Sequence, residues 1–291
     1  MNVEVLKVHA FTESVSGGNP AGVVVHSPRL DDSQMKQISF ELGVSETAFV
    51  FPSNVADFKV RFFSPTVEVD LCGHATIAAF FVMASQGLFG GRGVHRVTQE
   101  TNAGVLPVSV YYDPDGRLDR VMMAQRKPIY KNIYIDISFI AESLKIDTKD
   151  IDDSLPQQCV STGLFTLPVC VKSIDILRNI HPDFTKIKEI CTRLGVGSYH
   201  VFSFETIEPQ SAYHARNFAP LYGINEDPVT GTANGALSSY LVHHHLLTTH
   251  KLVCEQGDVI GRPGRVFVEI HDDTILVGGK ATLVEEKILE V

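Results

Sequence analysis

The chain has 291 residues, of which 44% are hydrophobic and 20% are charged, and its formal net charge is −9. This composition is typical of a soluble globular protein, and the length suggests about two domains. The acidic balance argues against nucleic acid or an anionic membrane as a partner, because both attract a basic protein surface. The longest apolar run, 75–84, is half of the roughly 20 residues that a membrane span needs.

Strand-like alternation of apolar and polar residues dominates much of the chain. Residues 1–11 begin with such a pattern, which reads as a strand and not as a signal peptide. The segments 58–63 and 104–112 also alternate, and the second is followed by the turn signal "DPDG". The segment 265–279 reads as a hairpin about Asp272-Asp273.

Helical patterns are fewer, and they lie at about 32–43, 75–88, 183–194 and 233–247. Low-complexity segments and long linkers are absent from the sequence. The combination predicts an α+β chain with mostly antiparallel strands.

The cysteines and histidines of the chain bear on its cellular compartment and on metal binding. The five cysteines, an odd number, form no CxxC pair, which favours a reducing, cytoplasmic setting. Three adjacent histidines at 243–245 would point in different directions on a helix, so no metal site is expected there.

Two stretches of the chain, 61–83 and 216–241, resemble each other. The first three matches have an offset of 155 residues and the next three an offset of 158; they are Arg61 with Arg216, Phe63 with Phe218, Pro65 with Pro220, Gly73 with Gly231, Ala75 with Ala233 and Ala78 with Ala236. These ordered matches predict an internal duplication. The second copy then has a three-residue insertion, which could carry Asp227.

The duplication predicts two similar domains, 1–119 and 120–280, and residues 281–291 could return to the first. Each domain presents a glycine-led helix start, at Gly73 and at Gly231. A helix N-terminus offers unpaired N–H groups and a partial positive charge, and glycine lets a ligand approach the backbone closely. If both helix starts face one cleft, that cleft is expected to hold a small carboxylate.

Three side chains of the first copy are candidates for chemistry. Glu46 lies at the start of an apolar strand, where burial would raise its pKa and suit it to general acid/base work; a solvated turn residue is the alternative. His74 can exchange protons near neutral pH. Cys72 reads first as a small buried residue at a tight turn, and second as a base activated by the helix start. Its match in the second copy, Thr230, has no thiol.

The second copy offers Asp227, which could bind a substrate amine or cap the helix, and Thr232, which could give a hydroxyl group to a ligand or act as a cap. Asn19, in the glycine loop "SGGNPAG", could line a site. The loop lacks GxGxxG, so dinucleotide binding is not expected, and the chain has no GxSxG, P-loop or HExxH motif.

Together these stretches resemble the PhzF-like, phenazine-biosynthesis isomerase family. The shared motifs are "GNPAGVV", "SETAFV", "FFSPTVEVDLCGHAT", "EDPVTGTANG" and "QGDVIGRPG", and the resemblance covers nearly the whole chain. It implies a diaminopimelate-epimerase-like fold, with two similar domains that each wrap a curved sheet around a central helix, and an active site in the cleft between them. It also implies proton-shift chemistry without a cofactor or a metal, and homodimers are common in the family.

The resemblance also implies roles for single residues. In the phenazine enzyme, the glutamate of the "SETAF"-type motif moves a proton within a dihydro-hydroxyanthranilate, and Glu46 holds that position here. The positions that would hold the substrate or bind its carboxylate are His74, Asp227, Thr232, Gly73 and Gly231. Phenazine-type members commonly have serine at the Thr232 position, so the extra methyl group here argues against the phenazine substrate itself.

Two other functions stay open at this point. One is a thiol-dependent racemase or epimerase of the same fold that uses Cys72. The other is a non-catalytic binding protein that keeps the fold alone.

Overall fold

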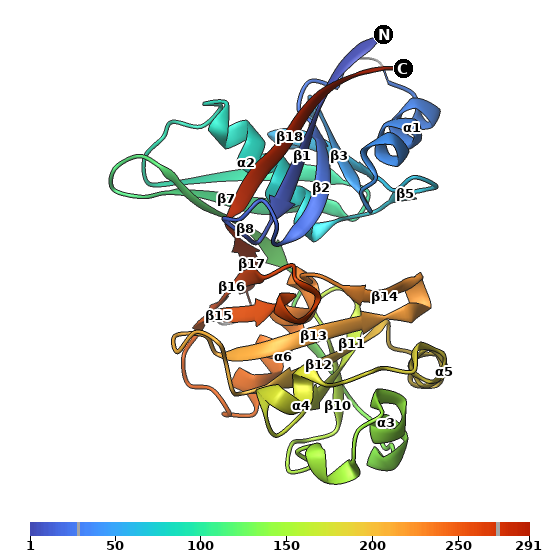
Figure 1. Cartoon of the computed structure of the whole chain (residues 1–291). Coiled ribbons are helices and arrows are strands. Elements are labelled where there is room, and N and C mark those ends of the chain that lie inside the picture. The colour runs from blue at the N-terminus through green and yellow to red at the C-terminus, as the bar shows by residue number, and fades with distance from the viewer. Residues whose placement is uncertain (28–29, 272–273) are drawn as a thin grey trace. The chain divides into compact units, whose positions relative to one another are not determined.

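The structure is a computed structural model that describes residues 1–27, 30–271 and 274–291. The chain forms two compact units (Figure 1). The first comprises Met1–Ala124 and Gly278–Val291, and the second comprises Gln125–Val277. The turn expected at Asp272-Asp273 lies outside the described residues. Within the described ranges, no helix combines the length and the apolar character that crossing a membrane requires.

The described part of the first unit forms the long helices α1 (Asp32–Leu42) and α2 (Gly73–Ser85). Its strands are β1 (Asn2–Ala10), β2 (Asn19–Val24), β3 (Thr47–Phe51), β4 (Phe58–Phe63), β5 (Glu68–Val69), β6 (Val94–Thr101), β7 (Gly104–Tyr112), β8 (Leu118–Gln125) and β18 (Ala281–Glu290). The strands pair in the order β18, β1, β2, β3, β4, β6, β7, β8, and β5 pairs with β4. Two pairings, β2 with β3 and β4 with β6, are parallel, and the others are antiparallel.

In the residues that the structure describes, the helices of the second unit are α3 (Ile137–Leu144), α4 (Ile174–Arg178), α5 (Phe184–Leu194) and α6 (Gly231–His243). Its strands are β9 (Ile129–Asn132), β10 (Gln158–Ser161), β11 (Phe165–Cys170), β12 (Ser198–Ser203), β13 (Tyr213–Ala219), β14 (Ile224–Asp227), β15 (Lys251–Gln256), β16 (Gly264–His271) and β17 (Thr274–Gly279), the last of which runs on into the first unit. Short 3-10 turns lie at Thr148–Asp150, Pro220–Tyr222 and Asp258–Ile260.

The two units repeat one pattern of strand pairing. From β1 to β7 the successive pairings are antiparallel, parallel, antiparallel, parallel and antiparallel. From β10 to β16 the same five directions recur in the same order. The strands β5 and β14 also correspond, since each pairs with the strand that precedes it. The α+β class with two similar halves is therefore confirmed.

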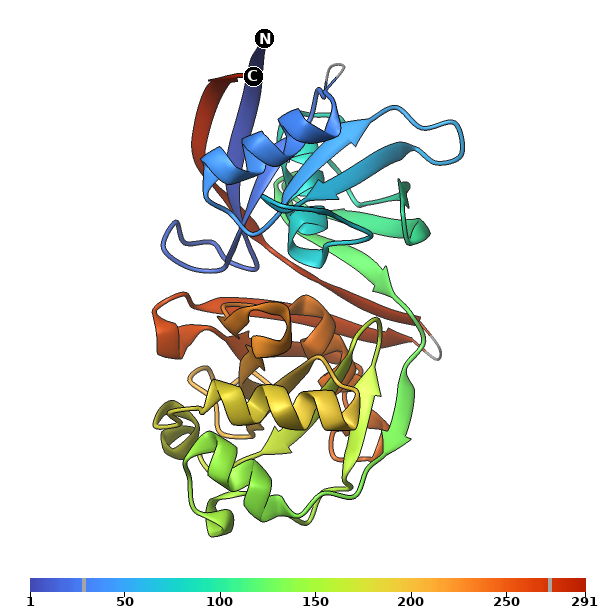
Figure 2. The ribbon, with the colours of Figure 1, turned by 90° about the vertical axis from the view of Figure 1, so that its right-hand side faces the viewer.

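Each unit is built around one helix that is buried on nearly all sides. The helix α2 buries nine of its residues, from Ala75 to Ala84, and contacts β1, β2, β3, β7 and β18. The helix α6 buries ten residues and contacts β10, β11, β12 and β16. The helix α2 is apolar all round, which is typical of a helix in a core. The helix α6 also buries polar side chains, which are hydrogen-bonded, as Asn234 is to Gln256 and Ser239 to the Gly235 carbonyl group. Both helices can therefore be covered by the curved sheet. The helix α1, drawn in blue, instead lies on the outside of its unit (Figure 2). It buries Met35, Ile38 and Leu42 on the face toward the core.

The four expected helices are present, with shifts at their ends. The helices α2 and α6 begin two residues before the expected ranges, at Gly73 and Gly231. The sequence did not predict α3, because its isoleucines and Phe139 are also typical of strands. The side chain of Asp136 accepts a hydrogen bond from the Ser138 N–H and starts this helix.

An arginine–glutamate pair is repeated in both units. Arg61 on β4 donates two hydrogen bonds of 2.8 Å to Glu68 on β5. Arg216 on β13 donates two hydrogen bonds of 2.8 Å to Glu226 on β14. Each guanidinium also lies 4.9 Å from the ring centre of the phenylalanine two residues further on. The repeated geometry supports the duplication independently of the sequence matches.

The repeat also corrects the position of the insertion in the second copy. Phe62 pairs with Val69, and Asn217, its match in the second copy, pairs with Asp227. Asp227 therefore corresponds to Val69, at the later of the two offsets. The three extra residues lie earlier, between Pro220 and Glu226, so the interpretation that the insertion carries Asp227 is wrong.

Candidate active site

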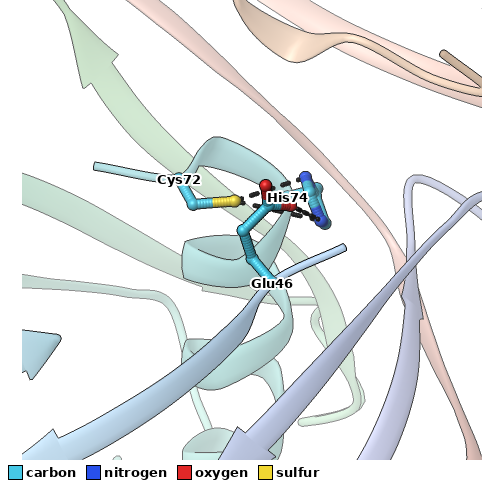
Figure 3. Close-up of side chains that lie close together, drawn as sticks. All are labelled: Glu46, Cys72 and His74. Atoms are coloured by element: carbon cyan, nitrogen blue, oxygen red, sulfur yellow. Dashed lines mark hydrogen bonds and ion pairs between the residues drawn. The ribbon is translucent and has the colours of Figure 1, made fainter. Parts of the chain in front are cut away.

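Three side chains of the first unit converge at the start of α2 (Figure 3). The Glu46 Oε2 atom lies 3.3 Å from the His74 Nε2 atom. The Cys72 sulfur lies 3.4 Å from Nδ1 and 3.8 Å from Nε2 of the same imidazole ring. The Ser45 hydroxyl group lies 3.4 Å from Nε2. The structure thus brings together the three candidate side chains of the first copy, and both Glu46 and Cys72 contact the imidazole of His74.

Glu46 is held by the backbone of the neighbouring strand. It lies directly before β3, and its carbonyl oxygen accepts a hydrogen bond of 3.0 Å from the N–H of Gly22 on β2. A side chain at Gly22 could not fit, because its Cβ would lie 2.4 Å from the hydroxyl oxygen of buried Thr47. Since β2 and β3 are parallel, both strands begin at the same end of the sheet. Asn19, which is buried at the start of β2, lies at this end of the sheet, three residues before Gly22.

Cys72 is the N-cap residue of α2. Its carbonyl oxygen accepts hydrogen bonds from the backbone N–H and the hydroxyl group of Thr76, at 3.0 and 2.8 Å. Its side chain does not cap the helix and is directed at His74 instead. The first turn, which starts with Gly73, therefore keeps the partial positive charge of a helix N-terminus.

The cluster is partly shielded from water. The side chains of Glu46 and His74 keep 20% and 13% of their exposure, and Cys72 is buried. A carboxylate, an imidazole and a thiol in mutual contact can pass protons between one another and to a ligand. Their ligand atoms also all lie within 4.8 Å of one another, so they could hold a metal ion.

In the second unit, Asp227 and Thr230 contact each other at the start of α6. The Thr230 hydroxyl group donates a hydrogen bond to the Asp227 carboxylate. Thr230 is the N-cap residue, and its side chain makes no capping bond. Thr232 is the second residue of α6 and lies in its first turn, directly after Gly231 in the sequence. Neither Asp227 nor Thr232 is therefore the N-cap residue. The expectation that these residues share a ligand with Glu46 stays a prediction.

Gln256 lies in the "QGD" stretch of the sequence but is not among the residues predicted for the site. Its side chain is fully buried and holds the start of α6. Its amide oxygen accepts hydrogen bonds from the Thr230 N–H at 3.1 Å and the Asn234 side chain at 2.7 Å. Its amide nitrogen donates to the Asp227 carbonyl at 2.9 Å and to the Thr230 hydroxyl at 3.1 Å. A glutamine next to a glycine-rich turn gives no signal of this role from sequence alone.

The duplicated unit has no second Glu46. Phe63 pairs with Thr47 in the first unit, and its match Phe218 pairs with Tyr199 in the second. The residue before Tyr199, Ser198, therefore corresponds to Glu46. Ser198 is buried, and its hydroxyl group lies 2.8 Å from that of Thr166. At this pair of matched positions, only the first unit carries a carboxylate.

The adjacent histidines of α6 have separate packing partners. His243 stacks on Tyr130 with 4.3 Å between ring centres. The Nε2 atom of His244 lies 2.7 Å from the Gln158 side-chain oxygen.

Comparisons with known proteins agree with this fold. A crystal structure of the Bacillus anthracis phenazine biosynthesis protein, PhzF family, matches with a TM-score of 0.90 at 32% identity and covers 100% of both chains. A hydroxyproline epimerase from Agrobacterium vitis matches in fold, with a TM-score of 0.65 at 14% identity, over 99% of this chain and 91% of that chain. The uncharacterized isomerase YfhB of Bacillus subtilis (strain 168) is 36% identical over 293 residues and covers 99% of each chain. The protein is an enzyme of the isomerase class with an epimerase-like fold.

The family follows from a match over most of the sequence. The family model described as "Phenazine biosynthesis-like protein" matches residues 8–287. The chain belongs to this PhzC-PhzF family, and the resemblance seen in the sequence motifs is confirmed.

Proposed function

We propose that the protein is a cofactor-independent isomerase that moves a proton within a small unsaturated or amino-acid-like carboxylate. The observation that carries the proposal is the contact of 3.3 Å between Glu46 and His74 at the glycine-led start of α2. A carboxylate that is partly buried beside an imidazole is a suitable general acid/base. Membership of an isomerase family supports this type of reaction.

In the proposed reaction, Glu46 removes a proton from a carbon atom of the substrate. It then returns a proton at another position of the same conjugated system, so the overall reaction neither takes up nor releases a proton. His74 orients Glu46 and contacts the substrate. The N–H group of Gly73 binds the substrate carboxylate, because the helix start favours a negative charge. Asn19, at the same end of the sheet, supplies a further polar group that contacts the substrate.

The second unit is proposed to supply further binding groups. The Gly231 N–H group would bind a carboxylate in the same way as that of Gly73. Thr232 would give a hydroxyl group, and Asp227 would accept a hydrogen bond from a substrate amine. The methyl group of Thr232 leaves less room than a serine would, which favours a substrate other than the phenazine precursor.

A thiol-dependent racemase or epimerase is the second candidate, because the Cys72 sulfur lies 3.4 Å from the His74 imidazole. That contact would help to form a thiolate. A two-thiol mechanism needs a second sulfur, and the matching N-cap residue of α6 is Thr230. This difference favours Glu46 as the base.

The test is proton NMR in D₂O on a panel of small carboxylates, which includes dihydro-hydroxyanthranilate, cyclohexadienyl amino acids and common amino acids. The variants are Glu46→Gln and Cys72→Ser. The matched control is Glu41→Gln. Glu41 is an exposed glutamate of α1, and its carboxylate accepts a hydrogen bond from Gln37, one helical turn away. We expect deuterium to enter one compound at carbon, and Glu46→Gln to slow this by about 10²–10⁴.

Each result separates the candidates. Exchange that is lost in Glu46→Gln and kept in Cys72→Ser and Glu41→Gln supports the proposed base. Exchange at an amino acid α-carbon that is lost in Cys72→Ser and kept in Glu46→Gln supports the racemase instead. Exchange that both variants keep would refute both assignments. If no compound of the panel exchanges, the substrate lies outside the classes of carboxylate that the panel represents.

The cytoplasmic location and the homodimer are also proposals. They are checked by cell fractionation and by sedimentation equilibrium of the purified protein.

A further inference from the structure

The cluster of Glu46, Cys72 and His74 offers one oxygen, one sulfur and one nitrogen ligand atom. Zinc is bound in proteins by these three kinds of atom, and thiolate and imidazole favour it over harder cations. The three residues come from two separate segments, the residue before β3 and the first turn of α2. The fold therefore brings the ligand set together, since sequence spacing alone joins only Cys72 and His74.

Two of the three distances between the ligand atoms are close to those around a tetrahedral ion, and all three lie within 4.8 Å. With Zn–N and Zn–O bonds of about 2.0–2.1 Å and a Zn–S bond of about 2.3 Å, tetrahedral ligands lie about 3.3–3.6 Å apart. The observed separation of Glu46 Oε2 and His74 Nε2 is 3.3 Å. The Cys72 sulfur lies 3.8 Å from the same nitrogen. The Cys72 sulfur now lies nearer to Nδ1, at 3.4 Å, and a movement of this sulfur toward Nε2 would bring all three atoms onto one ion.

We infer that Glu46, Cys72 and His74 form a binding site for a thiophilic divalent cation such as Zn²⁺, and that the bound ion blocks the acid/base group. The blocking part rests on the proposed function of Glu46, whereas the binding part does not. Three protein ligands leave the fourth tetrahedral position open, where water or a substrate carboxylate can bind.

Binding changes the protonation of the cluster in a defined way. The Cys72 thiol must release its proton to the buffer, and the His74 nitrogen that binds must be unprotonated. The thiolate and the Glu46 carboxylate then balance the two charges of the ion. The affinity should therefore rise with pH. Mg²⁺ and Ca²⁺ should bind far more weakly, because both prefer oxygen ligands alone.

The test is a titration of the untagged protein with Co²⁺, which reports a sulfur ligand by a thiolate-to-cobalt charge-transfer band and needs no substrate. Zn²⁺ is then added to displace Co²⁺. The variants Cys72→Ser, His74→Gln and Glu46→Gln each remove one ligand atom. The control is His245→Asn, which shortens the exposed run of histidines at the end of α6; His245 has a positive φ of 58°, which asparagine tolerates. Far-UV circular dichroism checks that each variant is folded.

We expect wild type and His245→Asn to show the band and to lose it when Zn²⁺ is added. Cys72→Ser should lack it. His74→Gln and Glu46→Gln should bind Co²⁺ at least about 10-fold more weakly, since even loss of an outer-shell contact costs 10- to 100-fold. The inference is overturned if wild type shows no band, or if folded Cys72→Ser keeps it.

The binding part and the proposed function can fail separately. If the band appears but Glu46→Gln keeps full deuterium exchange, the metal site stands and the proposed base is wrong. If exchange needs Glu46 but no band appears, the proposed base stands and the metal site is wrong. If Zn²⁺ binds and leaves the exchange rate unchanged, the blocking part is overturned.

Discussion

The repeated arginine–glutamate pair allows one substitution to be made twice in two environments. We compare Glu226→Gln in the second unit with Glu68→Gln in the first. Both changes replace a carboxylate that accepts two hydrogen bonds from an arginine by an amide of the same shape. The side chains of Arg216 and Glu226 keep only 6% and 13% of their exposure. Those of Arg61 and Glu68 keep 24% and 23%.

The loss of stability depends on the hydrogen bonds that each arginine keeps after the substitution. Removing one partner of a buried pair costs about 3–5 kcal/mol, because a charge is left unpaired in the interior. Arg216 keeps hydrogen bonds to the carbonyl groups of Leu177 and Ile180, at 3.0 and 2.9 Å, so we expect the lower end, about 3 kcal/mol. Arg61 keeps an ion pair with Asp32 at 2.9 Å and is more exposed, so Glu68→Gln should cost about 1 kcal/mol.

The assay is native-state hydrogen–deuterium exchange with mass spectrometry, because it reports the free energy of opening for each unit by itself. Peptides that contain β13 should exchange faster in Glu226→Gln, and peptides that contain β4 should change little in Glu68→Gln. Equal losses in the two units, or a larger loss in Glu68→Gln, would refute the argument that burial sets the cost.

Three further predictions concern the second unit. Burial opposes ionisation of Glu255, but hydrogen bonds from His214 and from the N–H groups of Ile207 and Glu208 outweigh it and lower its pKa from 4.5 to about 2. Because the folded pKa lies below the ordinary one, this stabilisation is full above pH 4.5 and is lost as the pH falls toward 2, by about 3 kcal/mol. Urea unfolding at several pH values should show this loss, and Glu255→Gln should flatten it. Gln256→Ala leaves several buried groups without their partner and should cost about 3 kcal/mol in the same assay, with no change in Gln210→Ala, an exposed glutamine. Gly257→Ala should cost about 2–3 kcal/mol, since φ is +91° and a Cβ would lie 2.2 Å from the Arg262 carbonyl oxygen; a melting temperature equal to that of wild type would contradict this.

Much of the fold could be predicted because its signals are local. The alternation over 58–63 and 104–112 coincides with β4 and β7, since each strand has one face toward a core. The duplication was visible in six matched residues, and the repeated pairing order explains why they persist. By contrast, α3 was missed because its buried face, which includes Ile140 and Leu144, is too short to show a helical period.

The candidate site was only partly visible in the sequence. The motif carried Glu46 and His74, but nothing local shows that Cys72 turns toward the imidazole and does not cap its helix. The helix α6 and the strand β15 separate Thr230 from the side chain of Gln256 in the sequence, so only the folded structure reveals their contact. Ser198 as the counterpart of Glu46 follows from strand register, which sequence matching did not reach.

The last strand of the chain has a consequence for synthesis. β18 pairs with β1 over its whole length, from Asn2 with Glu290 to Ala10 with Ala281, so the two ends lie side by side (Figure 1). Domains usually fold in the order in which they leave the ribosome, the N-terminal one first. Here the second unit, Gln125–Val277, is complete before β18 is made. Until β18 is made, the edge of β1 that faces away from β2 stays unpaired. An unpaired strand edge can pair with another chain. Nascent molecules of this enzyme should therefore be most prone to aggregation, and most dependent on chaperones, after the second unit is made and before β18 has paired with β1.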